Sequence, residues 1–323
     1  MRIKYFASLL LVTALTSCTK GDFVLNDKVF CFDTIIEAKL FEGEQSDIDE
    51  IHNLCVTYDK LTDNYKTYEG ITNISSINTT NKEIEINPRL YDILKISRAA
   101  SAKGANNYNI LCGGLAKAWK DALSAKEILS DTVIQEELNK INNSDLLFFD
   151  NNIVQRVGEA EIDLGGVAKG YVLDEIYGYL SFRGITHYLI NGGSSSILLG
   201  EKESKDGLFN VGIDSKIIPN RYMKLKNCFV STSAVSVQGV QLEEDGPIYS
   251  HIINPKTGSA INEQDAVIVV SDSGYLGDIL STSMMMNTLE EIKEIEKEQD
   301  VKCIVIKDKE ITYVNEELEV LYR

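Results

Sequence analysis

The sequence predicts an α+β fold built as a single domain. Helical patterns fill most of the chain up to about residue 141, whereas strand patterns dominate beyond it. This segregation favours an α+β fold over the regular alternation of a doubly wound sheet. Hydrophobic residues make up 44% of the 323 residues, which is ordinary for a globular chain, and no repeated or low-complexity segment interrupts them.

The first half of the chain predicts a series of helices. An extended stretch leads into a helix over 46–66, and Pro88, a residue suited to the first helical turn, begins another. Further helices are expected over 115–123 and 126–141. Residues 146–154 then predict a hairpin, because its Asp-Asn-Asn turn consists of residues that tolerate left-handed backbone conformations.

The second half predicts mainly strands, interrupted by helices over 167–182 and 275–298. The expected strands cover 186–191, 195–200, 208–214, 222–231, 248–253, 265–271, 301–306 and 310–314.

A glycine pair stands where one strand-like segment becomes a helix, within residues 162–174. Gly165 and Gly166 allow a sharp turn and a close approach to a ligand, and the helix start that follows directs free N–H groups at any anion there. Lys169 adds a mobile positive charge. These features suit a phosphate-binding turn. Taken alone, the segment fits better a strand-to-helix turn with a solvated lysine.

One of only three histidines, His251, precedes an Asn-Pro-Lys-Thr-Gly turn at 254–258. The rigid turn would fix the histidine, whose ordinary pKa near ~6.5 suits it to accept a proton at neutral pH. A histidine at a strand end, bonded to the backbone, is an equally good interpretation of this segment alone.

A carboxylate and a hydroxyl four residues apart follow near the end of the chain. If Asp278 opens a helix, Thr282 shares its face, and the two oxygen groups point at one spot. Such hard oxygen ligands suit Mg²⁺, which completes its coordination with phosphate and water. The alternative is an Asp278 N-cap with Thr282 bonded back to the helix, and it would prevail without other observations.

The three segments together resemble the FAD:protein FMN transferase family, known as ApbE, over nearly the whole mature chain. Its Asp-Leu-Gly-Gly-Ile-Ala-Lys-Gly signature is present at 163–170 with a downstream aspartate at Asp174, its His-Ile-x-Asp-Pro-x-Thr-Gly at 251–258, and its Ala-Asp-Ala-x-x-Thr-Ala at 277–283. The order and spacing fit. Weaker similarities are found at Asp33, Thr34, 75–78, Leu115, Trp119 and 191–193.

The resemblance implies a single catalytic domain with mixed, mainly antiparallel sheets and flanking helices. It implies transfer of FMN from FAD to a threonine or serine hydroxyl of a target protein, with release of AMP. Mg²⁺ would be held by Ala168, Asp278 and Thr282, and His251 would accept the proton of the attacking hydroxyl. The residues expected to bind FAD are Asp163, Gly165, Gly166, Lys169, Asp174, Gly192, Gly193, Ser194, Thr232, Ser233 and Thr257.

The chain departs from the family pattern where acids are common. Asn109, Ser194 and Asn254 replace three family aspartates, and Ala234 replaces a glycine that tolerates positive φ. Two other functions therefore stay open. One is a Mg²⁺-dependent FAD pyrophosphatase that releases FMN and AMP, and the other is a catalytically silent flavin-binding lipoprotein.

The N-terminus predicts export and lipidation. Arg2 and Lys4 precede an apolar run that is too short for a permanent membrane span and ends in small residues before Cys18. We expect a signal peptide over 1–17, a lipid-anchored tether over 18–28 and the catalytic domain over 29–323. The protein would be held on the bacterial cell membrane, facing the periplasm or the exterior. A signal peptide with a chance cysteine is the alternative.

Charge and cysteine content narrow the partners. The net charge of −17, which becomes −19 without Arg2 and Lys4, argues against nucleic acid, because an acidic surface repels a phosphate backbone. Besides Cys18 the chain has five cysteines without a Cys-x-x-Cys pair, so neither a disulfide framework nor a zinc site is expected.

Overall fold

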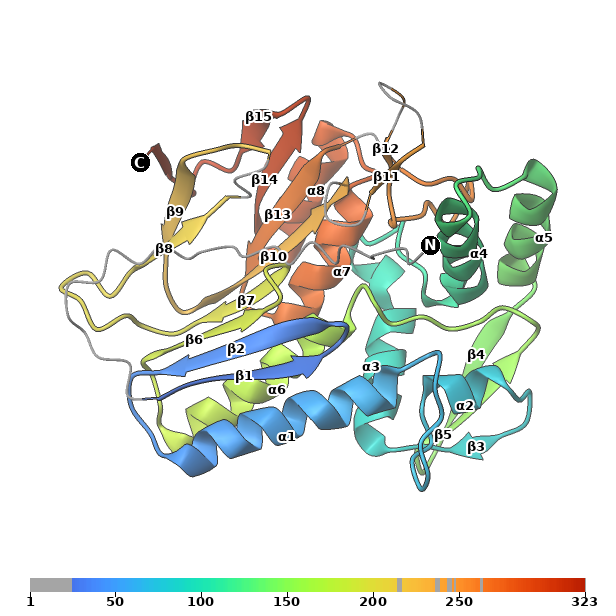
Figure 1. The fold of residues 1–323 in the computed structure, drawn as a ribbon, viewed down its shortest axis with the longest axis horizontal. Coiled ribbons are helices and arrows are strands. Elements are labelled where there is room, and N and C mark those ends of the chain that lie inside the picture. Colours follow the sequence, from blue (N-terminus) through green and yellow to red (C-terminus); the bar gives the residue numbers. More distant parts are fainter. Residues whose placement is uncertain are drawn as a thin grey trace, which may run out of the picture.

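The computed structural model describes residues 25–213, 217–235, 239–242, 246, 248–261 and 264–322 (Figure 1). Within them, a central sheet has the order β1-β2-β6-β7-β10-β13-β14-β15, and every neighbouring pair is antiparallel. The α+β class with antiparallel sheets is confirmed. Its strands are β1 Leu25–Cys31, β2 Thr34–Leu40, β6 Tyr188–Gly192, β7 Ser196–Leu199, β10 Cys228–Ala234, β13 Ala266–Ser271, β14 Lys302–Lys307 and β15 Glu310–Val314.

Helices cover one face of this sheet. Figure 1 shows α6 and α7 behind the central strands, and α7 packs on β10 and β13 while α1 packs on α6. The helices are α1 Gln45–Thr62, α2 Ile74–Asn78, α3 Pro88–Arg98, α4 Gly113–Ser124, α5 Asp131–Asn142, α6 Ala168–Arg183, α7 Gly274–Met284 and α8 Leu289–Gln299, with 3-10 turns η1 Ala100–Lys103 and η2 Ile110–Cys112.

Smaller sheets complete the fold. One contains β3 Ile84–Glu85, β5 Ile153–Val157 and β4 Asp145–Phe149, and another contains β16 Val320–Tyr322, β9 Arg221–Leu225 and β8 Phe209–Gly212. A short hairpin joins β11 Val240–Gln241 to β12 Ile248–Tyr249.

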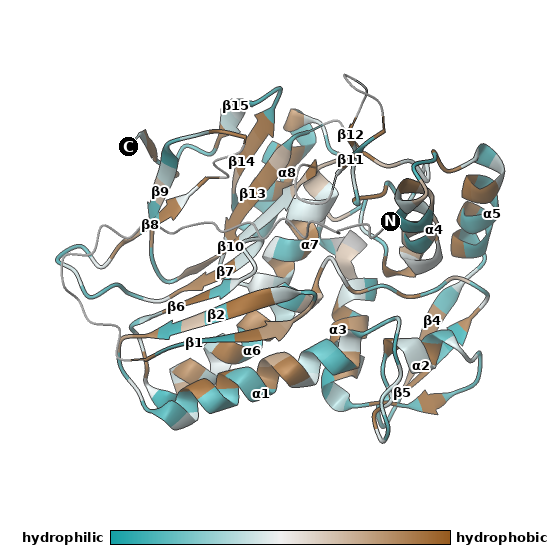
Figure 2. Ribbon diagram, viewed as in Figure 1, coloured by the Kyte–Doolittle hydropathy of each residue, from teal (hydrophilic) through white to brown (hydrophobic). Residues whose placement is uncertain are grey.

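Alternate residues of the central strands enter two cores. In β13, Val267 and Val269 belong to the core beneath the helices, whereas Ile268 and Val270 belong to the core shared with β8 and β9. Because side chains alternate along a strand, burial on both faces requires the nearly continuous apolar run of this segment. Figure 2 shows hydrophobic residues concentrated in β13 and β14, and both hydrophilic and hydrophobic residues along α1.

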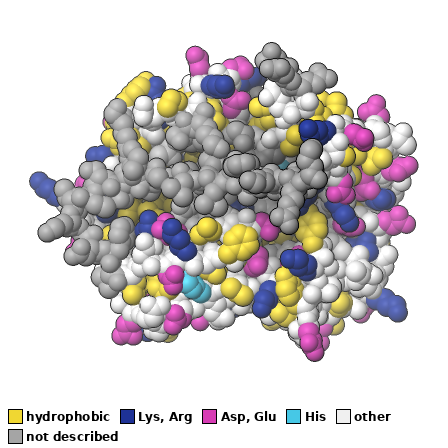
Figure 3. Space-filling model, in the orientation of Figure 1, with side chains coloured by type: hydrophobic (Ala, Val, Ile, Leu, Met, Phe, Trp, Pro, Cys, Tyr) yellow, Lys and Arg dark blue, Asp and Glu magenta, His cyan; other side chains and the backbone are white. Residues whose placement is uncertain are grey.

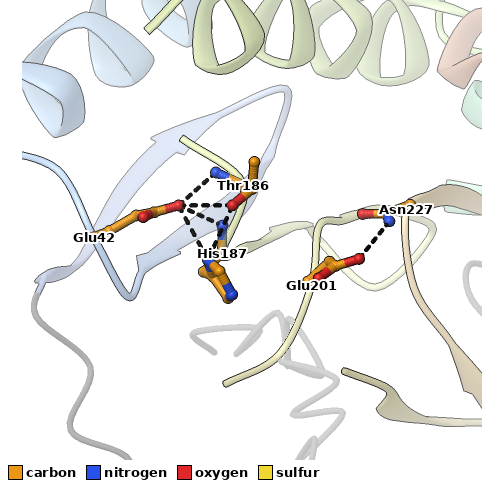
Figure 4. A network of polar contacts seen from close by, with 5 residues as sticks. All are labelled: Glu42, Thr186, His187, Glu201 and Asn227. Atoms are coloured by element: carbon orange, nitrogen blue, oxygen red, sulfur yellow. Dashed lines mark hydrogen bonds and ion pairs between the residues drawn. The ribbon is translucent and has the colours of Figure 1, made fainter. Parts of the chain in front are cut away.

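A polar network joins the chain just after β2 to the start of β6. The Glu42 carboxylate accepts hydrogen bonds from the N–H groups of Thr186 and His187, from the Thr186 hydroxyl at 3.1 Å, and contacts His187 Nδ1 at 3.2 Å (Figure 4). These bonds tie the chain just after β2 to the segment that enters β6. Partial burial raises the pKa of Glu42, but the hydrogen bonds outweigh it and lower the pKa to about 2.

Several predicted helix and strand boundaries are wrong, and local turns or helix caps explain most of them. The expected strand 222–231 is two strands, because Asn227 turns the chain with a φ of 47°. The expected helix 275–298 is also two, since Thr288 forms a capping box that begins α8. The expected helix 126–141 begins later, at α5, where Ser130 caps it. β12 covers only two residues of the expected strand 248–253.

At the N-terminus, β1 begins at Leu25, ahead of the predicted domain start at residue 29, and the expected signal peptide and Cys18 lie outside the described residues. Within the part of the chain that is described, no helix has the length and apolarity needed to cross a membrane.

Candidate active site

The site begins where α6 and α7 approach each other without intervening side chains. A Cβ atom on Gly170 would lie 2.1 Å from the carbonyl oxygen of Gly274, and one on Gly274 would lie 2.3 Å from the carbonyl oxygen of Gly170. Neither distance allows a side chain, so glycine is needed at both positions. The backbones can therefore meet, and the start of α6 lies directly against Asp278 of α7.

Asp278 is the buried centre of this arrangement, 7% exposed. Its Oδ1 accepts hydrogen bonds from the hydroxyls of Ser196 at 2.8 Å and Ser231 at 2.7 Å, and its Oδ2 accepts one from the N–H of Gly170 at 2.7 Å. Burial raises the pKa of Asp278, while the charge of Lys169 and these hydrogen bonds oppose the rise. The carboxylate thus accepts donors from three elements and lies within reach of one lysine's charge.

The start of α7 is fixed by Asp174 of α6. Its two carboxylate oxygens accept hydrogen bonds from the N–H groups of Gly274 and Tyr275, each at 2.8 Å. Burial raises the pKa of Asp174 to about 6 against these bonds. α7 begins at Gly274, so the expectation that Asp278 opens or caps this helix is wrong. Asp174 positions α7, and its contact with a flavin ligand stays a prediction.

Thr282 lies one turn after Asp278 on the same helix, as predicted. Its hydroxyl donates to the carbonyl oxygen of Asp278 at 3.0 Å and lies 3.2 Å from the Ser233 hydroxyl. The bond back to the helix, which was the alternative interpretation, is therefore present. It uses the hydroxyl proton and leaves oxygen lone pairs for a cation, so the two interpretations are compatible.

The glycine turn meets α7 at this hydroxyl. A Cβ atom on Gly166 would lie 3.0 Å from the Tyr108 ring and 3.5 Å from the Thr282 hydroxyl oxygen. Neither Gly165 nor Gly166 has a positive φ, so these glycines matter because they lack a side chain. Asp163 shapes the turn by accepting hydrogen bonds from the Gly165 N–H at 2.6 Å and from Asn64 at 2.9 Å. An FAD contact of Asp163 stays a prediction.

The turn between β6 and β7 supplies Ser196. Gly193 and Ser194 both have a φ of 72°, and a Cβ atom on Gly193 would lie 2.4 Å from the Thr34 hydroxyl. The tight turn therefore needs glycine at one position and packs beside the family-like Asp33-Thr34 pair. It also lies next to β10, because the N–H of Thr232 donates to the carbonyl oxygen of Ser195 at 2.6 Å.

Lys169 and His251 are the basic side chains of the site. Lys169 is half-buried at the start of α6, and no described residue forms an ion pair with it. His251 is exposed, yet desolvation and then the charge of Lys169 lower its pKa to about 4. Water therefore reaches the ring, while the protein atoms around it supply the desolvation that lowers the pKa. No hydrogen bond joins the ring to a described residue, in contrast to the strand-end alternative.

The loop after His251 is rigid. The Asn254 side-chain oxygen accepts from the N–H groups of Lys256 at 2.9 Å and Thr257 at 3.2 Å, and the Trp119 ring N–H donates to the Gly258 carbonyl at 2.7 Å. Trp119 therefore ties the loop to α4. Thr257 is exposed in this turn, and its contact with FAD stays a prediction.

The neutral replacements retain structural roles. The side-chain oxygens of Asn109 and Asn254 each accept backbone N–H groups two or three residues ahead, a role that needs an acceptor and no charge. Ser194 donates its N–H to Asn191 at 2.8 Å. Ala234 lies in β10 without a positive φ, so this chain does not need a glycine there.

The donor set fits Mg²⁺ better than a metal that needs several charged ligands. Within the described ranges, no three His, Cys, Asp or Glu side chains converge on a metal position. One carboxylate with neutral hydroxyl and carbonyl oxygens instead suits a cation that keeps water and phosphate in its coordination. Ala168, the expected carbonyl ligand, is buried as the first residue of α6 and lies beside Lys169.

Two residues at the centre of the site were missed by sequence reasoning. Ser196 and Ser231 both contact Asp278; Ser196 lies in an otherwise apolar strand, and Ser231 begins a run of three polar residues in β10. The polar run 231–233 inside a buried strand was the available signal, because a hydroxyl facing a core needs a partner.

The fold and the site define an α+β protein whose helix start, glycine turn and buried carboxylate suit a phosphorylated ligand. The sequence matches the ApbE family over residues 32–305, and the chain belongs to that family.

Comparison with individual proteins agrees with this assignment. The chain is 23% identical over 251 residues to a FAD:protein FMN transferase of Klebsiella pneumoniae, covering 76% of each chain. It is 25% identical over 239 residues to one of Vibrio cholerae, covering 71% of this chain and 70% of the relative. Its fold is similar to the flavin transferase ApbE from Vibrio cholerae, with a TM-score of 0.73 and 19% identity over 90% of this chain and 97% of that one. The ApbE protein from Thermotoga maritima gives a TM-score of 0.76 and 20% identity over 91% and 97% of the two chains.

Proposed function

We propose that this protein transfers FMN from FAD to a threonine or serine hydroxyl of a target protein, releases AMP and depends on Mg²⁺. The observation that carries the proposal is the meeting of the glycine turn, the start of α6 and the Asp278–Thr282 face of α7, in a chain of the ApbE family. Relatives named FAD:protein FMN transferase support the same activity.

Different residues of the site would bind the pyrophosphate and the metal ion. Lys169 would neutralise the pyrophosphate oxygens and the N–H of Gly166 would help to orient them, since backbone N–H groups at a helix start favour an anion. The Gly165 N–H is already donated to Asp163, which holds the turn in shape. Asp278 and Thr282, with the Ala168 carbonyl, would hold Mg²⁺. That ion, when bound, stabilises the negative charge that develops on the phosphate oxygens.

His251 accepts the proton in the transfer. The acceptor oxygen forms a bond to the FMN-side phosphorus, the bond from that phosphorus to the AMP oxygen breaks, and the hydroxyl proton moves to the imidazole. With a pKa lowered to about 4, the ring is unprotonated at neutral pH and ready to accept. The negative charge of bound FAD raises that pKa and strengthens the base where it is used.

Hydrolysis is the second candidate activity. His251 is exposed, so water can replace the acceptor hydroxyl, and the protein would then act as a Mg²⁺-dependent FAD pyrophosphatase that releases FMN and AMP. A catalytically silent flavin-binding role has less support, because Asp278, Thr282 and His251 are retained and the replacements at Asn109 and Asn254 keep their acceptors.

We also propose that the protein is a lipoprotein exported to the bacterial cell membrane through Cys18. The support is the small-residue sequence before Cys18, which lies outside the described residues. FAD and an acceptor protein are the proposed partners, and nucleic acid is not. On the face shown in Figure 3, basic side chains are scattered among acidic ones and gather into no continuous patch outside the grey atoms.

Product analysis tests the activity. The protein is incubated with FAD and Mg²⁺, with and without a peptide carrying an acceptor threonine, and AMP, FMN and modified peptide are separated by chromatography. Transfer predicts AMP equal to modified peptide with little free FMN. Free FMN equal to AMP in the presence of peptide would instead establish the pyrophosphatase.

A further inference from the structure

The two hydroxyls on Asp278 reach it from the same face of one strand pair. Ser196 begins β7 and Ser231 lies in β10, and the two residues are direct partners in the antiparallel register. Both are 1% exposed, and both donate to the same oxygen, Oδ1 of Asp278. A Cβ atom on Gly277 would lie 2.7 Å from the Ser231 hydroxyl, so α7 leaves space for this contact.

These bonds decide how many lone pairs the carboxylate offers to a cation. A carboxylate oxygen has about two lone-pair positions. Two hydroxyl donors fill both positions on Oδ1, and the N–H of Gly170 fills one on Oδ2. One position on Oδ2 remains, so Asp278 can contact a cation through a single oxygen.

We propose that Ser196 and Ser231 are specificity-determining positioning residues that make Asp278 a monodentate ligand and thereby favour Mg²⁺ over Ca²⁺. The proposal rests on the proposed Mg²⁺ site. Mg²⁺ requires compact octahedral geometry, to which one carboxylate oxygen is well suited. Ca²⁺ takes six to eight oxygens and gains from a carboxylate that binds through both. Because the two serine hydroxyls occupy Oδ1 of Asp278, this second carboxylate oxygen cannot bind Ca²⁺.

The test compares cation affinities directly. Isothermal titration of MgCl₂ and of CaCl₂ into the FAD-saturated protein, without acceptor peptide, gives the ratio of the Ca²⁺ Kd to the Mg²⁺ Kd. We expect Ser196→Ala/Ser231→Ala to lower that ratio by about tenfold, the equivalent of one charge-assisted hydrogen bond. Each single variant should lower it less.

A matched control is Ser271→Ala. Ser271 also lies beside α7 and is buried, but its hydroxyl donates to the Ser273 carbonyl at 2.8 Å and no contact joins it to the Asp278 carboxylate. The control should keep the wild-type ratio. If the double variant loses affinity for both ions equally, the serines have only a structural role and the inference is overturned. A wild type that binds no Mg²⁺ would overturn the proposed metal site as well. Wild-type Mg²⁺ binding with an unchanged ratio in the double variant overturns this inference alone.

Discussion

Replacing Asp278 with asparagine should separate stability from function. The side chains have nearly the same size, and the site can satisfy an amide: the carbonyl oxygen takes the Gly170 N–H, while the two serine hydroxyls rotate to accept from the NH₂ group. Burial raises the pKa of Asp278, so its ionised form costs folding free energy at neutral pH. Asp278→Asn should therefore fold and gain about 1 kcal/mol of stability without metal.

The same change should remove the effect of Mg²⁺. At one hundred times its Kd, a ligand adds about 2.7 kcal/mol, which corresponds to a Tm rise of about 4 °C for a domain near this size. We expect this rise in the wild type and none in Asp278→Asn. Loss of the carboxylate ligand should lower the transfer rate by about 10²- to 10³-fold, or about 3 to 4 kcal/mol.

Differential scanning calorimetry with and without Mg²⁺, beside a transfer assay, measures both effects. A variant that unfolds below the wild type in chelator would refute the hydrogen-bond reasoning. Full activity of Asp278→Asn in chelator would refute the metal role.

Other changes test the remaining parts of the account. His251→Ala should keep FAD affinity within a few-fold and lose about 10²-fold or more in transfer rate; weak FAD binding with normal transfer at saturation would make the residue a cofactor contact. The wild-type transfer rate should fall as the pH drops below the ordinary histidine pKa toward about 4. Lys169→Ala should weaken FAD binding and move this fall in rate to higher pH, because the charge of Lys169 helps to lower the pKa of His251. A pH profile that does not move in Lys169→Ala would contradict the electrostatic coupling between Lys169 and His251. Glu42→Gln should cost about 1 kcal/mol at pH 7 after allowance for solvent screening. Because the pKa of Glu42 is lowered from 4.5 to about 2, the stabilisation is present above pH 4.5 and lost toward pH 2, so the difference in unfolding free energy should shrink across that range, and a constant difference would argue against a charge effect. Cys18→Ala should release the protein from membranes, and N-terminal mass analysis that finds cleavage elsewhere without lipid would contradict the anchor.

Local patterns in the sequence predicted much of the fold. Pro88 begins α3 as expected, and the Asp-Asn-Asn turn joins β4 to β5 with positive φ at Asn151 and Asn152. These features depend on neighbours in the chain. The split of the last helical stretch at Thr288 could have been read from its capping box, because Glu291 follows three residues later. The pairing of β7 with β10 was not predictable, since it joins segments far apart in the sequence.

The sequence indicated some of the residues that the fold brings together at the candidate site, but not their contacts. The helical spacing of Asp278 and Thr282 follows from sequence alone, whereas the serines that hold the carboxylate come from separate strands. Asp174 shows that a motif can indicate a residue without indicating what that residue contacts. Its place in the motif indicated a ligand contact, but tertiary packing directs both of its oxygens to the N-terminus of α7.

The most direct test of the proposed function is the intact mass of an acceptor peptide after incubation with the protein, FAD and Mg²⁺. The account predicts a gain equal to FMN less water on the threonine-containing peptide, abolished by Asp278→Asn and absent from a matched peptide with alanine in place of threonine. An unchanged peptide mass, with FAD consumed to FMN and AMP or left intact, would contradict transfer.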